Sequence, residues 1–244
     1  MGIGAYFIQR GKELEHCGLP ILDLGCGDGR FVRELEILFP GRVYGFDLVS
    51  AESKCRQNLA GTPSEKLLGS NIRFGTEQSG LPFEDDYFGL IISNQVIEHV
   101  DDLDFFFSHA ARVLSPKGCL LAAFPPKTHI VEAHCRAPLV HWIPGGTGRR
   151  TYLNATHSLF NIPRRQSTEN VGEFWDQWIK RKTHYRMPGH VRYVASKYFE
   201  QIDDDASAYA RSIMGDVPGI RLLRWIPYYL LNTTLIMYRH RTFS

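Results

Sequence analysis

The sequence has no marked excess of charge of either sign. Its 28 lysines and arginines stand against 26 acidic residues, which gives the 244 residues a net charge of +2 with histidine neutral. Basic residues occur only in short clusters such as Arg149-Arg150, which are typical of solvated surface. Nothing in this balance indicates nucleic-acid binding, and we expect no nucleic-acid partner.

Cysteine and long hydrophobic runs are also scarce. The five cysteines contain no C-x-x-C pair, so we expect neither a disulfide framework nor a zinc knuckle, and we predict a cytoplasmic location. The most apolar stretch, residues 225–237, is interrupted by Pro227 and Asn232. It is shorter than the roughly 20 apolar residues that span a bilayer. No transmembrane segment and no signal segment are therefore predicted.

Glycine, by contrast, is concentrated at alternate positions near the start of the chain. Asp23 is followed by Gly25, Gly27 and Gly29, directly after an apolar run and directly before a helical pattern. Because glycine has no Cβ, such a turn leaves bare backbone against which a ligand can lie. The dinucleotide fingerprint G-x-G-x-x-G would place its third glycine at Arg30. This spacing disfavours NAD as the ligand, although an NAD-binding oxidoreductase remains an alternative.

Strand and helix patterns alternate after this turn. Asp47 ends the next apolar run, residues 42–47, where a carboxylate can accept both hydroxyls of a ribose. The alternation predicts a doubly wound α/β sheet with parallel strands and right-handed crossovers. The predicted helices are residues 31–38, 51–60 and 103–114, and the later strands are residues 71–74, 87–93, 119–124, 220–226 and 232–238.

The alternation stops over residues 125–216, which are rich in proline, histidine, arginine and aromatic residues. A helical pattern at residues 169–181 is the clearest element there. Long insertions in compact domains are usually functional. We therefore predict a single domain, residues 1–244, in which residues 125–216 form a substrate lid or cap.

The glycine turn has the form D-x-G-x-G-x-G and resembles the first motif of class I S-adenosylmethionine-dependent methyltransferases. Residues 80–88, 93–100 and 112–118 resemble three further segments of the ubiquinone- and menaquinone-type enzymes in that family. The resemblance covers about half the chain. It implies a seven-stranded sheet with an antiparallel last strand, a largely helical insertion after the fifth strand, S-adenosyl-L-methionine as cofactor and a small-molecule acceptor.

The resemblance also implies which residues hold the cofactor. The loop after the third strand lacks the Asp that the family often places near the adenine, and Glu77 stands there in its place. The cofactor-binding residues expected on this basis are Asp23, Gly25, Cys26, Gly27, Gly29, Asp47, Leu48, Glu77, Asn94 and Gln95.

Histidines provide the candidate catalytic groups. If the acceptor is a hydroxyl, a base must take its proton, and histidine suits neutral pH. His99, His134 and His141 are the catalytic candidates, with Arg136 and Trp142 as candidate substrate contacts. A catalytic zinc held by Glu132, His134 and His141 is an alternative, and we assign no metal.

The predicted function is methyl transfer to a hydroxyl of a secondary metabolite or saccharide. The alternatives are an N- or C-methyltransferase, for which alignment alone can suffice, and a catalytically silent cofactor-binding partner of another subunit. The sequence leaves the oligomeric state open.

Overall fold

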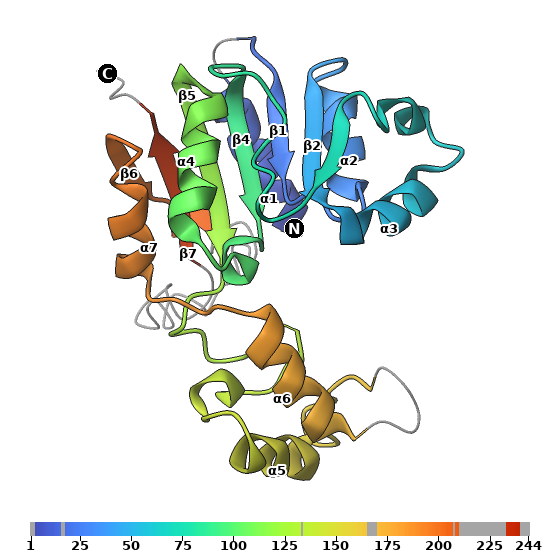
Figure 1. Cartoon of the computed structure of the whole chain (residues 1–244), viewed down its shortest axis with the longest axis vertical. Helices are drawn as coiled ribbons and strands as arrows, with labels where there is room; N and C mark the ends of the chain where they lie inside the picture. Colours follow the sequence, from blue (N-terminus) through green and yellow to red (C-terminus); the bar gives the residue numbers. More distant parts are fainter. Residues whose placement is uncertain are drawn as a thin grey trace, which may run out of the picture.

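The computed structural model describes residues 3–15, 18–132, 134–164, 170–206, 208–209 and 233–239. Its centre is a seven-stranded sheet in the order β3-β2-β1-β4-β5-β7-β6 (Figure 1). β7 pairs antiparallel with both β5 and β6, and the remaining pairs are parallel. The predicted fold class is confirmed. The strands are β1 (Ile21–Leu24), β2 (Val43–Leu48), β3 (Ile72–Gly75), β4 (Phe88–Asn94), β5 (Leu114–Phe124), β6 (Gln201–Asp204) and β7 (Thr233–Tyr238).

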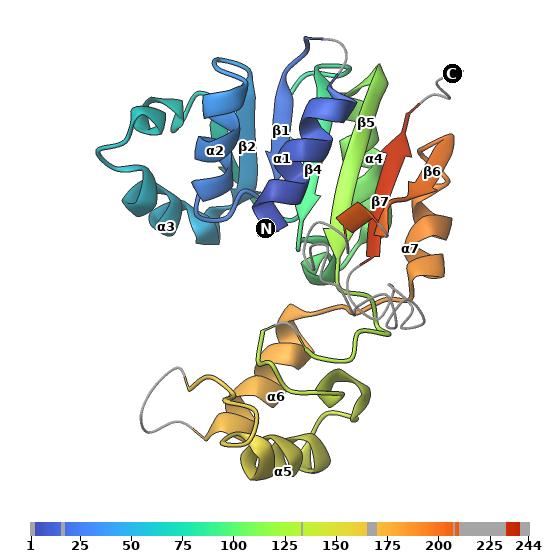
Figure 2. The ribbon, with the colours of Figure 1, turned by 180° about the vertical axis from the view of Figure 1, so that it is seen from behind.

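Helices cover both faces of the sheet (Figure 2). On one face α1 (Ile3–Leu14), α2 (Arg30–Leu38) and α3 (Val49–Leu59) pack over the first strands. On the other face lie α4 (Leu103–Val113) and α7 (Pro188–Ala195). Because both faces are covered, the central strands are buried along most of their length, which explains why β1 and β4 are mainly apolar, with Asp23 as the one charged residue of β1.

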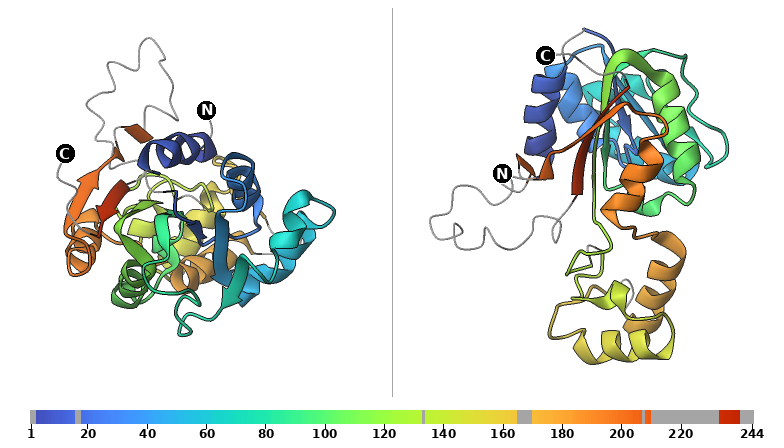
Figure 3. Two further views of the ribbon diagram at one scale, coloured as in Figure 1. Left: turned by 90° about the horizontal axis from the view of Figure 1, so that it is seen from above. Right: turned by 90° about the vertical axis from the view of Figure 1, so that its left-hand side faces the viewer.

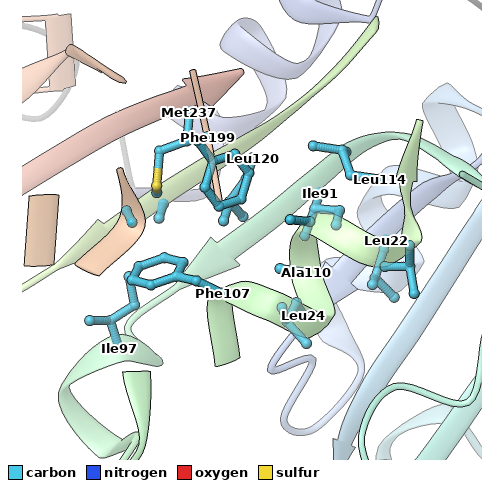
Figure 4. Close-up of a cluster of buried hydrophobic side chains, with 14 of the residues drawn as sticks. Leu22, Leu24, Ile91, Ile97, Phe107, Ala110, Leu114, Leu120, Phe199 and Met237 are labelled. Atoms are coloured by element: carbon cyan, nitrogen blue, oxygen red, sulfur yellow. The ribbon is translucent and has the colours of Figure 1, made fainter. Parts of the chain in front are cut away.

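Alternate side chains of a central strand enter two different hydrophobic clusters. Leu22, Ile91 and Phe107 of α4 belong to one cluster, members of which are drawn in Figure 4. Ile21 and Leu90 point the other way and join the cluster beneath α1 and α2. This alternation fixes the register of the strands, because a shift by one residue would exchange the two faces.

The cap, residues 125–187, leaves the sheet where β5 ends and returns where α7 begins (Figure 3). It contains the helices α5 (Thr147–Thr156) and α6 (Val171–Lys182) and the short turn η3 (Val140–Trp142). A second short turn, η2 (Ile97–His99), follows β4 outside the cap. Trp175 of α6 is fully buried in a separate cluster with Leu153 of α5. The cap therefore has a hydrophobic core of its own.

Two elements inside residues 125–216 belong to the sheet and its covering layer. Helix α7 packs against α4, and β6 forms the edge strand beside β7. The predicted strand at residues 220–226 lies outside the described residues, and among the described strands β6, residues 201–204, is at the edge of the sheet. This strand was missed because three of its four residues are polar, as an exposed edge allows.

Smaller differences concern element boundaries. Helix α3 begins at Val49, two residues before the predicted start at residue 51. Strand β5 begins at Leu114 because Leu114 already pairs with Phe88, and regular pairing resumes at Cys119 after an irregularity. Among the described residues no helix is long and apolar enough to cross a membrane.

Candidate active site

The three glycines of the turn after β1 are required for different structural reasons. All adopt positive φ, at 91° for Gly25, 52° for Gly27 and 76° for Gly29. A Cβ on Gly25 would lie 2.2 Å from Cγ2 of Val96, and one on Gly29 would lie 2.8 Å from Sγ of Cys55. A Cβ on Gly27 would meet no atom within 4 Å. Gly25 and Gly29 thus allow close packing, whereas Gly27 faces open space that a ligand can use.

Asp47 stands at the end of β2 opposite this turn. Its Oδ2 accepts a hydrogen bond of 2.6 Å from the N–H of Gly27, and its Oδ1 accepts one of 2.6 Å from Leu48. Burial raises the pKa of the Asp47 carboxyl, and the two N–H donors oppose that rise. The carboxylate is held at the edge of the open space beside Gly27, where it can accept hydroxyl hydrogens.

Asp23 lies on β1 directly beneath the turn and is 3% exposed. Burial raises its pKa to about 8, and the nearby carboxylates of Asp47 and Asp28 add to the rise. Oδ2 of Asp23 has no hydrogen-bond partner. An orphaned buried carboxyl favours a cationic ligand, and S-adenosylmethionine carries both an ammonium and a sulfonium charge.

Two more buried polar atoms at the end of β4 also lack partners. They are Oδ1 of Asn94 and Nε2 of Gln95, and Gln95 adopts a φ of 58°. Buried polar groups are normally hydrogen-bonded, so these atoms are suited to a polar ligand beside Asp23. The residues present therefore fit the implied cofactor, which Asp47, Asp23, Asn94 and Gln95 would hold against the glycine turn.

Two predicted cofactor residues are placed differently. Cys26 is buried, and its Sγ packs toward β2, since a Cβ on Gly45 would lie 3.1 Å from it. Glu77 is exposed in the turn after β3. That turn lies at the same sheet edge as Asp47, because Leu48 pairs with Gly75. Roles for both residues in cofactor binding stay predictions.

His99 and His134 come together where the cap meets the sheet. Their ring centroids are 5.1 Å apart, and both rings contact the indole of Trp178. His99 follows β4, and its Nδ1 donates to the carbonyl oxygen of Lys182 in the cap. Burial lowers the pKa of the His99 imidazole, which favours the neutral ring.

Glu132 fixes the orientation of His134. Its carboxylate is 1% exposed and accepts from Nδ1 of His134 at 2.8 Å, from the N–H of Cys135 at 2.6 Å and from the hydroxyl of Tyr185. Burial alone would raise the pKa of Glu132, but these hydrogen bonds outweigh it and lower the pKa to about 2. Because Glu132 is ionised, it accepts a hydrogen bond from Nδ1–H of His134, and the lone pair of the neutral ring is then on Nε2.

Glu98 is a site residue that the sequence reasoning missed. It is 1% exposed, both of its carboxylate oxygens lack partners, and burial raises its pKa to about 8. One ligand atom each from Glu98, His99 and His134 lie within 4.8 Å of one another. The available signal was an acidic residue directly after the apolar pair Val96-Ile97.

The other acceptor-side candidates are not among the three residues whose ligand atoms converge. His141 contacts the ring of Tyr185 with centroids 5.0 Å apart, and burial lowers the pKa of its imidazole. Trp142 is 48% exposed and donates from Nε1 to the carbonyl of Lys127. Arg136 is exposed at a positive-φ turn position. Glu132, His134 and His141 do not form the alternative zinc site. The carboxylate of Glu132 already accepts hydrogen bonds from His134, Cys135 and Tyr185, and the ligand atoms that converge are those of Glu98, His99 and His134.

A pocket lies between the cap helices and the two chain segments that join the cap to the sheet. Tyr185 and His141 line it together with basic side chains. Tyr185 also hydrogen-bonds Glu132, so the pocket adjoins the Glu132–His134 pair. The basic residues of the lining are Lys127, Arg149, Arg150 and Lys180.

Residues 22–122 match the protein family described as a methyltransferase domain. The chain is 32% identical over 120 residues to a malonyl-[acyl-carrier protein] O-methyltransferase of Legionella pneumophila, covering 49% of this chain and 40% of that protein. It is 25% identical over 134 residues to a ubiquinone biosynthesis O-methyltransferase of Rhizobium johnstonii, covering 53% of this chain and 52% of that protein. The chain thus spans about half the length of these curated relatives.

Among solved structures, a phosphoethanolamine N-methyltransferase of Haemonchus contortus, bound to phosphomonomethylethanolamine and S-adenosylhomocysteine, shares the fold. The TM-score is 0.55 at 15% identity, and the match covers 98% of this chain and 53% of that chain. The sheet order and the matched residues agree: residues 22–122 carry a methyltransferase domain of the class I fold, and its cofactor is S-adenosyl-L-methionine.

Proposed function

We propose that this chain transfers a methyl group to a hydroxyl oxygen of a small molecule, such as a secondary metabolite or a saccharide. The observation that carries the proposal is the hydrogen bond from Nδ1 of His134 to the buried carboxylate of Glu132. A histidine held in this way keeps a free Nε2 that can accept a proton at neutral pH. An amine acceptor that is already neutral would not need such a group.

S-adenosylmethionine, when bound, supplies an electrophilic methyl carbon on its sulfonium. The glycine turn and Asp47 position that cofactor, and alignment of two reactants can contribute on the order of 7–11 kcal/mol to lowering a barrier. Nε2 of His134 accepts the hydroxyl proton as the oxygen attacks, and a positioned base of this kind typically contributes about 10²–10⁴-fold in rate. His99 is the second candidate base, because it lies against the same ring.

Two further observations support an acceptor site in the cap. The pocket that adjoins Tyr185 is lined from both α5 and α6. Asp176 in the lining already pairs with Arg149 and Arg150, and the remaining basic residues, Lys127 and Lys180, suit an acceptor that carries an acidic group. The two curated relatives described above are both O-methyltransferases by name. Transfer to nitrogen or carbon is the competing outcome.

The test is a panel of acceptors matched in skeleton, in which a hydroxyl is replaced by an amine or by hydrogen. S-adenosylhomocysteine release is measured for the wild type, His134→Ala, His99→Ala and the control His157→Ala, whose ring hydrogen-bonds to Asn154 at the end of α5. We expect hydroxyl members to be methylated and His134→Ala or His99→Ala to lower kcat, with S-adenosylhomocysteine affinity retained. Equal turnover in both variants and the wild type, or methylation of the amine members alone, would contradict the proposal.

A further inference from the structure

Glu98, His99 and His134 form a compact cluster, because one potential ligand atom of each lies within 4.8 Å of the others. Glu98 is 1% exposed, yet neither carboxylate oxygen has a hydrogen-bond partner. Leaving a buried polar group unpaired costs roughly 1–3 kcal/mol. A buried carboxylate without donors, beside two imidazoles, is the arrangement expected where a cation binds.

The two histidines are oriented for coordination. Nδ1 of His99 donates to the Lys182 carbonyl, and Nδ1 of His134 donates to the Glu132 carboxylate. Both contacts fix the tautomer with the proton on Nδ1, so that Nε2 of each ring carries the lone pair. Histidine ligands of metals almost always donate their other N–H to a carboxylate or a backbone carbonyl, and Glu132 and Lys182 supply one of each.

We infer that Glu98, His99 and His134 form a site for one divalent transition-metal ion such as zinc. This inference deepens the proposed function and rests on it only for the catalytic role of the ion. Two imidazoles and one carboxylate with a remaining open position match catalytic zinc and related first-row ions, whereas magnesium prefers oxygen ligands.

The geometry requires little rearrangement. The three ligand atoms lie within 4.8 Å of one another, while zinc bonds of ~2.0–2.2 Å in a tetrahedral site place ligand atoms about 3.4 Å apart. Each pair therefore has to approach by at most about 1.4 Å, which side-chain rotation can provide. Trp178 packs over both rings and shields this side of the site.

An ion here would change how the acceptor loses its proton. It would occupy the Nε2 lone pairs and lower the pKa of a hydroxyl bound at its open position. The proton then passes to solvent, the oxygen lone pair forms the bond to the methyl carbon, and the carbon–sulfur bond breaks with its electron pair on sulfur. The basic role of His134 Nε2 applies to the protein without the ion.

The test is calorimetric titration of chelator-treated protein with zinc chloride, without cofactor or acceptor. We expect one equivalent to bind to the wild type, and Glu98→Gln and His134→Ala to lose that binding. Glu132→Gln, which removes the partner of a ligand, should weaken binding by about 10–100-fold. The matched control is His184→Gln, because the backbone N–H of His184 contacts Glu98 while its ring lies outside the cluster.

Cobalt(II) titration provides the second measurement. Visible absorption typical of nitrogen and oxygen ligands, without a thiolate band, would show that the buried cysteines are not the ligands. Zinc affinity equal in the wild type and in folded Glu98→Gln and His134→Ala would overturn the inference. The titration needs no acceptor, so it is independent of the methylation assay. If the wild type bound no zinc, the inference would be overturned and the methylation results would stand. If zinc bound but no acceptor were methylated, only the proposed function would be refuted.

Discussion

Alanine substitutions at Gly25 and Gly27 should separate the packing role of the glycine turn from its ligand role. Both residues adopt positive φ, so both variants carry the left-handed backbone cost of roughly 1–2 kcal/mol. Only the Cβ at position 25 meets a neighbour, at 2.2 Å from Cγ2 of Val96. Forcing an extra carbon into a packed site typically costs about 1–3 kcal/mol more.

Gly25→Ala should therefore lower the free energy of unfolding by about 2–5 kcal/mol, and Gly27→Ala by only about 1–2 kcal/mol. Cofactor affinity should show the opposite ranking among folded variants, because the Cβ at position 27 fills the open space beside Asp47. Adding Val96→Ala to Gly25→Ala should recover part of the lost stability, since it removes the atom in conflict.

Urea unfolding followed by circular dichroism measures the stabilities, and titration with S-adenosylhomocysteine measures the affinities. If Gly27→Ala bound S-adenosylhomocysteine as tightly as the wild type, the space beside Gly27 would not be the cofactor site. If Gly25→Ala were no less stable than Gly27→Ala, the contact with Val96 would not constrain the turn.

Two further predictions concern buried carboxyl groups. The pKa of Asp23 is raised from 3.8 to about 8, so the folded state holds a proton that the unfolded state releases. Stability should fall as pH rises between about 4 and 8, by up to ~1.4 kcal/mol per pH unit, and urea titrations should show this slope reduced in Asp23→Asn. Glu132→Gln should lower kcat and shift its pH profile while leaving S-adenosylhomocysteine affinity unchanged, because Glu132 acts through His134; an unchanged pH profile would assign Glu132 a structural role.

The parts of the fold that the sequence predicted are those with local causes. The strands β1 and β4 are mainly apolar because helices cover both of their faces. The turn between β1 and α2 was recognisable because its backbone needs glycine at positive φ. The edge strand β6 has no such local cause, since Gln201–Asp204 is mostly polar and is defined by its pairing with β7.

The site divides in the same way. Asp47 could be located because the end of a strand in a doubly wound sheet is a position that sequence order reveals. The approach of His99 to His134 depends on how the cap folds back over the end of β4, through contacts such as that between His99 and Lys182, which are 83 residues apart. Glu98 could not be distinguished from a surface acid, because its burial is a consequence of the same contacts.

The most direct test of the account is calorimetric titration of the wild type and Asp47→Ala with S-adenosylhomocysteine, with Asp28→Asn as the control carboxylate and NAD as the control ligand. We expect saturable binding to the wild type and to Asp28→Asn. Asp47→Ala should lose two hydrogen bonds to a charged group, at roughly 1.5–3 kcal/mol each, which corresponds to a weakening of about 10²–10⁴-fold. Unchanged affinity in Asp47→Ala, or binding of NAD in place of S-adenosylhomocysteine, would contradict the assignment of this turn to the methyl donor.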